Sequence, residues 1–121
     1  MTENYTYYDG FEGEPEYTFY LYDGNFPVEK IHLWDGYFSD IIDTIEPTEK
    51  GWTSLAEYYH MCIEFDNDNW KIPDIKSALQ QLKNIDTSKI KFPESHEVLK
   101  LLVETFTRAY ENNLKIYIEY F

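Results

Sequence analysis

Cysteine, glycine and positive charge are all scarce in this sequence of 121 residues. The one cysteine, Cys62, has no partner for an internal disulfide, so we expect a reduced, cytoplasmic protein. Only 10 lysines and arginines oppose 23 aspartates and glutamates, which gives a net charge of −13. Since binding to nucleic acids and to anionic membrane surfaces depends largely on cationic side chains, direct binding to either is disfavoured.

Long apolar runs and targeting patterns are also missing. Residues 1–30 contain neither a basic stretch nor an apolar core of the kind found in signal peptides, which agrees with a cytoplasmic location. No run approaches the ~18–20 consecutive apolar residues of a membrane-spanning helix. We therefore expect no membrane partner.

The motifs of common catalytic and metal sites are absent as well. The five glycines form no phosphate-binding pattern, and the three histidines lack the spacing of a hydrolytic metal site. Residues 66–69 (DNDN) begin like a calcium-binding loop, but Trp70 and Lys71 occupy the positions where an oxygen ligand and a glycine are needed. The sequence predicts no catalytic residue, no metal site and no cofactor.

Aromatic residues, in contrast, are abundant. The chain has 12 tyrosines, 8 phenylalanines and 3 tryptophans, which are too many for a disordered protein. The length suits one domain over residues 1–121. Within it we distinguish an acidic, aromatic, strand-rich segment (1–38), a mainly helical segment (39–112) and a C-terminal strand (114–120).

A short motif of an aromatic residue followed by Asp-Gly occurs three times, at residues 8–11, 22–26 and 34–38. Asp-Gly favours turns because glycine accepts a positive φ and aspartate bonds to nearby backbone. We interpret the motifs as strand ends or turns flanked by core aromatics. A repeated aromatic and acidic binding element remains the alternative.

Hydrophobic periodicity predicts the remaining elements. Alternation predicts strands at 16–22 and 28–34, a short edge strand near 5–8 and a strand at 114–120. Helical spacing predicts helices at 38–45, 55–63, 75–82 and 93–112, although a strand remains an alternative over 55–65. Capping signals at Ser54 and Asp35, and prolines at Pro73 and Pro93, mark the helix starts. The predicted fold is α+β: a small antiparallel sheet, built from the N-terminal strands and the C-terminal strand, packed on three to four helices.

The negative charge is concentrated in the first part of the chain. Residues 1–70 contain 16 acids and only Lys30 and Lys50 as bases, whereas residues 71–121 contain 7 acids and 8 bases. The acids can serve solubility alone, or they can form a field that attracts a cationic partner. Interleaved tyrosine and tryptophan favour the second interpretation, because these residues anchor protein interfaces.

Parts of the second half resemble a known class of protein. Residues 51–60 (GWTSLAEYYH), 70–75 (WKIPDI), 78–82 (ALQQL) and the ending 115–121 are similar to small bacterial immunity proteins of contact-dependent growth inhibition and related polymorphic toxin systems. The resemblance covers mainly residues 51–121. It implies specific binding of a cognate toxin C-terminal domain, often a basic nuclease, and carries over no site residues.

The leading functional hypothesis is therefore an immunity protein, not an enzyme, that covers the active-site groove of a basic toxin domain with an acidic surface. The candidate binding residues are carboxylates and aromatic anchors: Asp9, Glu12, Glu14, Asp23, Asp35, Asp66, Asp68, Tyr8, Trp34 and Trp70. Two alternatives stay open: a nucleic-acid mimic that inhibits DNA-binding or restriction proteins, and a small enzyme or ligand-binding domain. The sequence does not determine the oligomeric state.

Overall fold

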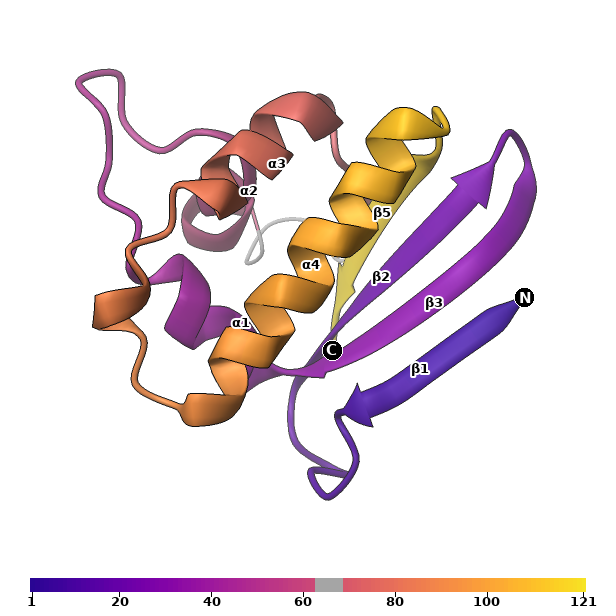
Figure 1. Ribbon diagram of the computed structural model, residues 1–121, viewed down its shortest axis with the longest axis horizontal. Coiled ribbons are helices and arrows are strands. Elements are labelled where there is room, and N and C mark those ends of the chain that lie inside the picture. The colour runs from indigo at the N-terminus through magenta and orange to yellow at the C-terminus, as the bar shows by residue number, and fades with distance from the viewer. Residues whose placement is uncertain (63–68) are drawn as a thin grey trace.

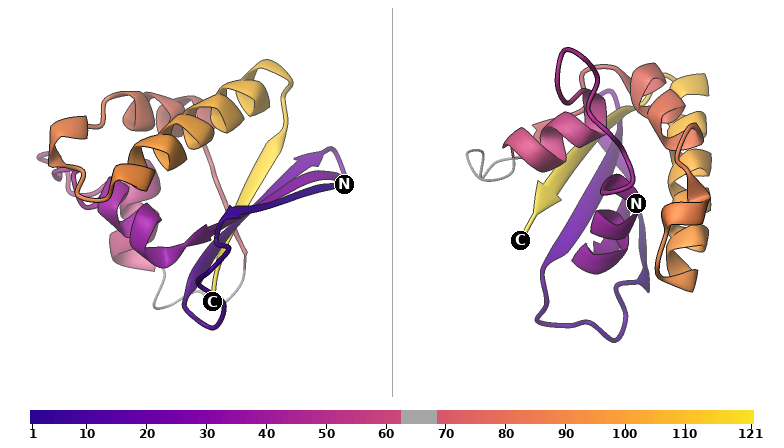
Figure 2. Two further views of the ribbon diagram at one scale, coloured as in Figure 1. Left: turned by 60° about the horizontal axis from the view of Figure 1, so that its bottom comes forward. Right: turned by 90° about the vertical axis from the view of Figure 1, so that its left-hand side faces the viewer.

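One sheet with helices packed against one of its faces makes up the fold (Figures 1 and 2). The computed structural model describes residues 1–62 and 69–121. Within them the sheet has five strands in the order β1-β3-β2-β5-β4. The strands are β1 (Thr2–Tyr7), β2 (Glu16–Asp23), β3 (Phe26–Trp34), β4 (Trp70–Lys71) and β5 (Lys115–Tyr120). The predicted α+β class is confirmed, including the N-terminal strands and the C-terminal strand.

Strand β2 lies at the centre of the sheet because one of its faces is entirely apolar. Tyr17, Phe19 and Leu21 point into the core and are at most 1% exposed. Phe19 pairs with Ile31 of β3 on one side and with Ile118 of β5 on the other. The C-terminal strand therefore joins the N-terminal sheet, as the alternation over 114–120 predicts.

The sheet differs from the prediction at one edge, where β1 pairs with β3 in parallel. The β2–β3 hairpin explains the difference, because it inserts β3 between β1 and β2. β1 and β3 then run in the same direction (Figure 1). The other described pairs are antiparallel. Strand β4, at the opposite edge, was not predicted; its two residues pair with β5.

Two of the three aromatic-Asp-Gly motifs form turns, as expected. Gly10 lies in the β1–β2 loop with φ +93°, and Gly24 lies in the β2–β3 hairpin with φ +59°. The motif at 34–38 forms no turn but marks a strand end, since β3 ends at Trp34 and helix α1 (Asp35–Ile42) begins at the next residue. Asp35 is the first helical residue of α1 and not its cap, because Trp34 occupies the capping position.

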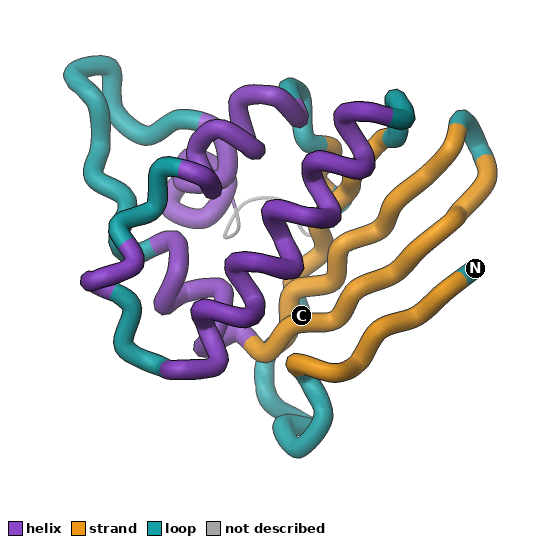
Figure 3. The backbone as a smooth tube through the Cα atoms, viewed as in Figure 1, coloured by secondary structure: helices purple, strands orange, loops and turns teal. Residues whose placement is uncertain are grey.

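The helices are α1, α2 (Ser54–Glu57), a π-helical turn η1 (Tyr58–Cys62), α3 (Ile75–Lys83), a 3₁₀ turn η2 (Thr87–Lys89) and α4 (Pro93–Glu111). Figure 3 shows them in purple against the orange strands. Helix α4 begins at Pro93, as predicted, and buries Val98, Leu102, Phe106 and Ala109 along one face. Leu99 is buried on the same face.

The predicted helix over 55–63 is confirmed only in part. Regular α-helix covers Ser54–Glu57, and the π-helical turn continues it to Cys62; residues 63–68 lie outside the described residues. The alternative of a strand is wrong over the described part of this region. The capping box does not form either, because Ser54 adopts φ +55° and Thr53 takes the capping position without a side-chain bond.

A side chain from helix α3 takes over the missing cap. The Gln81 Oε1 atom accepts the N–H groups of Leu55 (3.0 Å) and Ala56 (3.3 Å), and its Nε2 atom donates to the Thr53 carbonyl (2.9 Å). Helix α2 therefore begins where α3 can satisfy its first N–H groups.

Helix α3 begins at Ile75, as the apolar stripe over 75–82 predicts, and not at Pro73, the proline expected to mark its start. Asp74 is the cap, since its carboxylate accepts the Ser77 N–H at 3.2 Å, and Pro73 precedes it. The N–H group of Ser77 lowers the pKa of Asp74, and so does the Ser77 hydroxyl. Helix α1 ends at Ile42, before the predicted Ile45, and the Asp43 N–H still bonds to the Ser39 carbonyl.

The core lies between the sheet and the helices α1, α3 and α4. Phe19 contacts Phe38 of α1 and Phe106 of α4 edge-on, at centroid distances of 5.6 and 6.1 Å. In the part of the chain that the structure describes, no helix is both long and apolar enough to cross a membrane. The end of the core that faces the β1–β2 loop is rich in aromatic rings, and the candidate site lies there.

Candidate partner-binding surface

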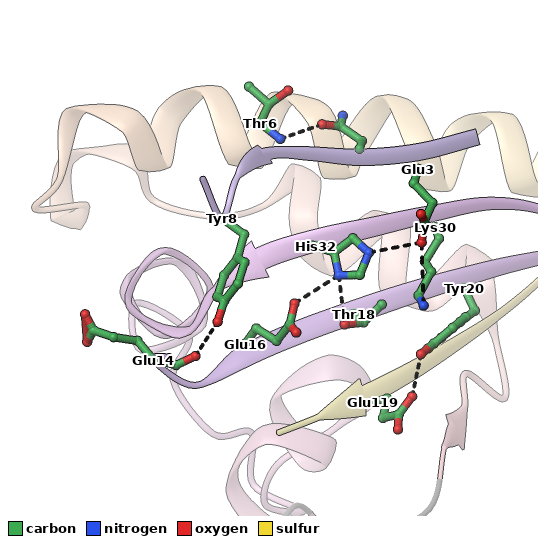
Figure 4. Close-up of polar contacts among 11 residues, drawn as sticks. Glu3, Thr6, Tyr8, Glu14, Glu16, Thr18, Tyr20, Lys30, His32 and Glu119 are labelled. Atoms are coloured by element: carbon green, nitrogen blue, oxygen red, sulfur yellow. Dashed lines mark hydrogen bonds and ion pairs between the residues drawn. The ribbon is translucent and has the colours of Figure 1, made fainter. Parts of the chain in front are cut away.

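The β1–β2 loop (residues 8–15) is held in a defined shape by its own hydrogen bonds. The Tyr8 hydroxyl donates to the Glu14 carbonyl at 2.7 Å, which closes the loop (Figure 4). The Phe11 N–H donates to the Tyr8 carbonyl and the Glu14 N–H to the Phe11 carbonyl. Gly13 adopts φ +92°, which a residue with a side chain would accept only with strain. The predicted anchor Tyr8 therefore shapes the loop through its hydroxyl.

Aromatic rings attach this loop to the rest of the protein. Phe11 stacks on Trp34 with centroids 4.2 Å apart, and Tyr37 meets both rings edge-on. Phe92, just before α4, packs on Trp34 at 5.7 Å and is 41% exposed. A Cβ atom on Gly36 would lie 2.3 Å from the Trp34 indole, so glycine is required under the ring. Trp34 thus packs against the core and is only half-buried, at the edge of a partly exposed aromatic cluster.

Carboxylates surround this cluster. Asp9, Glu12 and Glu14 are exposed on the loop, and the half-buried Asp35 adjoins them, since its N–H donates to the Pro15 carbonyl at 3.0 Å. Asp43, the residue directly after the end of α1, lies close enough to act on Asp35. We call these five carboxylates the acidic end: Asp9, Glu12, Glu14, Asp35 and Asp43.

Two carboxylates of the acidic end, Glu12 and Asp35, have pKa values that are shifted in opposite directions. The backbone N–H groups of Glu12 and Gly10 lower the pKa of Glu12; the Gly10 bond is 3.3 Å long. Burial raises the pKa of Asp35, and the nearby carboxylates of Asp43 and Glu14 raise it further. Asp35 therefore carries a charge that its surroundings disfavour, and an incoming cation would relieve this.

Helix α4 adds two more acids next to the aromatic cluster. Burial raises the pKa of the Tyr37 hydroxyl, and the carboxylates of Glu94 and Glu97 contribute. Among the described residues, no lysine, arginine or histidine forms an ion pair with Asp9, Glu12, Glu14 or Asp35. The negative charge at this end is therefore not neutralised within the described part of the molecule.

A pocket of about 390 Å³ borders the acidic end between α1 and residues 89–92. Asp40 lies in its wall but is already bound, because its carboxylate accepts the N–H groups of Lys91 (3.0 Å) and Phe92 (2.9 Å). Burial acts to raise the pKa of Asp40, but these N–H groups outweigh it and hold the pKa below its ordinary value. Lys89 and Lys91 line the pocket and mark where the acidic surface stops.

The structure separates the other predicted site residues from this surface. Asp23 is the last residue of β2, next to the β2–β3 turn and at the opposite end of the strand from Glu16 and the loop. Trp70 lies on the edge strand β4, where it pairs with Ile118 and stacks on Tyr58 at 4.8 Å. The predicted residues Asp66 and Asp68 lie outside the described residues. The idea of one surface for all ten candidates is therefore wrong for Asp23 and Trp70.

Sequence reasoning missed Asp43, Phe11, Tyr37 and Phe92. Phe11 carries a usable signal, because it completes the first aromatic-Asp-Gly motif. Phe92 and Asp43 have no local signal, since they reach the site only through the packing of α1 against α4. In the described part of the chain, no three His, Cys, Asp or Glu side chains gather as a metal site.

Comparison of the chain with protein-family models, with curated proteins and with solved structures found no match. The resemblance to immunity proteins therefore remains a prediction, and the functional argument depends on the geometry of the acidic end.

Proposed function

We propose that this protein binds a basic partner protein through the acidic end, and that the partner is a cognate toxin domain which it neutralises as an immunity protein. The observation that carries the proposal is the group of unpaired carboxylates around a half-exposed aromatic cluster. Such a surface combines aromatic anchors with charges that speed the approach of a cationic partner.

Inhibition by this route needs no chemistry. A nuclease groove binds phosphates with lysine and arginine side chains. Carboxylates of the acidic end would occupy those side chains and exclude the substrate. The aromatic rings of Phe11 and Trp34 would add apolar contact at the centre of the interface.

Co-expression tests the proposal directly. The chain is produced with the C-terminal domain encoded by an adjacent toxin gene, and cell survival and co-purification are measured. We expect both; dead cells and no complex would contradict the proposal. Capture of several unrelated DNA-binding proteins, without one tight partner, would favour the nucleic-acid mimic instead.

Charge variants locate the binding surface. The triple variant Asp9→Asn, Glu12→Gln, Glu14→Gln lowers the negative charge by three, from −13 to −10. The control Asp23→Asn, Glu49→Gln, Glu111→Gln makes the same change at exposed acids outside the acidic end. We expect the first variant to lower the association rate about tenfold or more at low salt and the control to leave it nearly unchanged. Equal effects would show that net charge alone matters.

A further inference from the structure

The second face of the sheet is open in the part of the chain that the structure describes. The described helices pack on the face that carries Phe19 and Ile118 (Figure 2, left). The opposite face carries alternate residues of β2, β3 and β5. We call the following residues the open face: Tyr20, Tyr22, Lys30, Lys115, Tyr117 and Glu119. Thr18 and His32 lie on the same side of the sheet but are buried, and the Tyr5 ring stacks on His32 at 3.9 Å.

Tyrosines occupy the middle of the open face. Tyr20 and Tyr117 are paired across β2 and β5, and Tyr22 contacts the Tyr117 ring edge-on at 5.5 Å. All three are only half-buried. Tyrosine offers a large contact area at low cost in conformational entropy, and it is enriched in protein interfaces.

Charges on the open face are balanced, unlike those of the whole chain. Lys30 lies 3.6 Å from Glu3 of the edge strand β1, and the Tyr20 hydroxyl donates to Glu119 at 2.6 Å (Figure 4). The Lys30 ammonium also lies over the Tyr20 ring, 5.0 Å from its centroid. The acidic end would repel a second copy of the chain. The open face carries little net charge and would not repel it.

The charged residues of β5 are ordered along the strand. Glu119 is level with Thr18, Tyr117 with Tyr20, and Lys115 with Tyr22. Lys115 and Glu119 are therefore equally spaced on either side of the tyrosine row, one cationic and one anionic. If a second copy of the strand is laid over the first in the reverse direction, the lysine of each copy faces the glutamate of the other.

We propose that the open face is a homodimer interface. A two-fold axis that lies across the strands, over the Tyr20–Tyr117 row, reverses the strand direction of the second copy. It places Lys115 opposite Glu119 of the second copy, and Glu119 opposite Lys115 of the second copy. The tyrosine rows meet at the axis, as an isologous interface requires.

The size of the face indicates that the dimer is weak. Three strands about 4.8 Å apart, over about five residues that each rise about 3.3 Å, give the open face a footprint of roughly 15 by 17 Å. That is smaller than the ~800 Å² per partner of a standard interface. We expect dimerisation with a dissociation constant in the micromolar range or weaker.

Sedimentation velocity from low micromolar to millimolar protein tests the proposal. We expect the wild type to shift from monomer to dimer over this range. Lys115→Glu and Glu119→Lys, each alone, place like charges opposite one another and raise the dissociation constant about tenfold or more. The matched controls Lys76→Glu and Glu111→Lys, exposed on α3 and α4, leave it near the wild-type value.

Mixing the two open-face variants gives the decisive measurement. In the mixed dimer both contacts again join a lysine to a glutamate, so we expect dimers to return. Tyr117→Ser, which removes the central ring without changing charge, should weaken the dimer as well. A monomeric wild type at millimolar concentration, or a mixture that does not recover, would overturn the proposal.

Discussion

Asp40 provides the sharpest test of the structural reasoning, because a single carboxylate joins two helices distant in sequence. It lies on α1, is 9% exposed, and accepts the N–H groups of Lys91 and Phe92 at the start of α4. Phe92, the capping residue of α4, has no side-chain cap of its own. Asp40 therefore holds the two residues that precede α4 from another helix.

The expected effect of Asp40→Ala follows from these bonds. A hydrogen bond to a charged group contributes about 1.5–3 kcal/mol. Since Lys91 and Phe92 are exposed and water can replace part of the loss, we expect a total of about 3 kcal/mol. An entropy of unfolding of about 2.1 cal/mol/K per residue then gives a fall in Tm of about 12 °C. Asp40→Asn, which keeps one acceptor, should lose about half as much.

The dependence on pH has a definite sign. The folded-state pKa of Asp40 is held below the ordinary value of 3.8, so its contribution is present above that value. It is lost as the pH falls through the folded-state pKa. Urea unfolding of wild type and Asp40→Ala should therefore differ by a constant amount from pH 7 to 5, and the difference should shrink below pH 3.8.

Glu46→Ala is the matched control. Glu46 makes a surface ion pair with Lys89 at 3.6 Å with its side chain 82% exposed, and such pairs contribute about 0–1 kcal/mol. A loss below about 1 kcal/mol for Asp40→Ala, or an equal loss at all pH values, would refute the assigned role of this carboxylate.

Three further substitutions test other parts of the structure. Gln81→Ala should lower the free energy of unfolding by about 1–2 kcal/mol and speed hydrogen exchange at Leu55 and Ala56, since α2 loses its cap; unchanged exchange would argue against the cap. Gly36→Ala should displace the Trp34 indole, destabilise the fold by about 1–3 kcal/mol and change tryptophan fluorescence; an unaltered spectrum would contradict the close contact. Asp35→Asn should raise Tm at pH 7, because a raised folded-state pKa means that the charged form is disfavoured by folding. The same variant should weaken partner binding, and a lower Tm would show that the helix N-terminus favours the charge more than burial opposes it.

Strong periodic patterns account for the part of the fold that the sequence predicts well. The alternation in β2 and β5 and the apolar stripe of α4 describe surfaces that must be buried, so element type and burial follow together. The α+β class and the pairing of β5 with the N-terminal sheet also follow. The parallel pairing of β1 could not be predicted, because it depends on where the β2–β3 hairpin inserts.

Helix starts were less predictable, for a physical reason. A capping box at Ser54 is a local signal, yet Gln81 from α3 supplies the acceptor for α2. Asp40 likewise binds the residues just before α4. Both contacts come from residues at least 25 positions away in sequence, and local spacing carries no information about them. The candidate site shows the same limit: the loop acids could be predicted from their sequence, whereas Phe92 joins the site only through tertiary packing.

The stability of the acidic end bears on how it would bind a partner. Loop carboxylates on a flexible segment would lose conformational entropy on binding, which weakens association. Here the Tyr8 hydroxyl closes the loop, Phe11 is stacked on Trp34, and the Asp35 N–H holds Pro15. The charges are thus ordered before a partner arrives. This order has a cost, because burial of Asp35 and then its repulsion by Asp43 and Glu14 raise the pKa of this carboxyl. Neutralisation of Asp35 would relieve this cost, and a cation bound beside its carboxylate would relieve it in the same way.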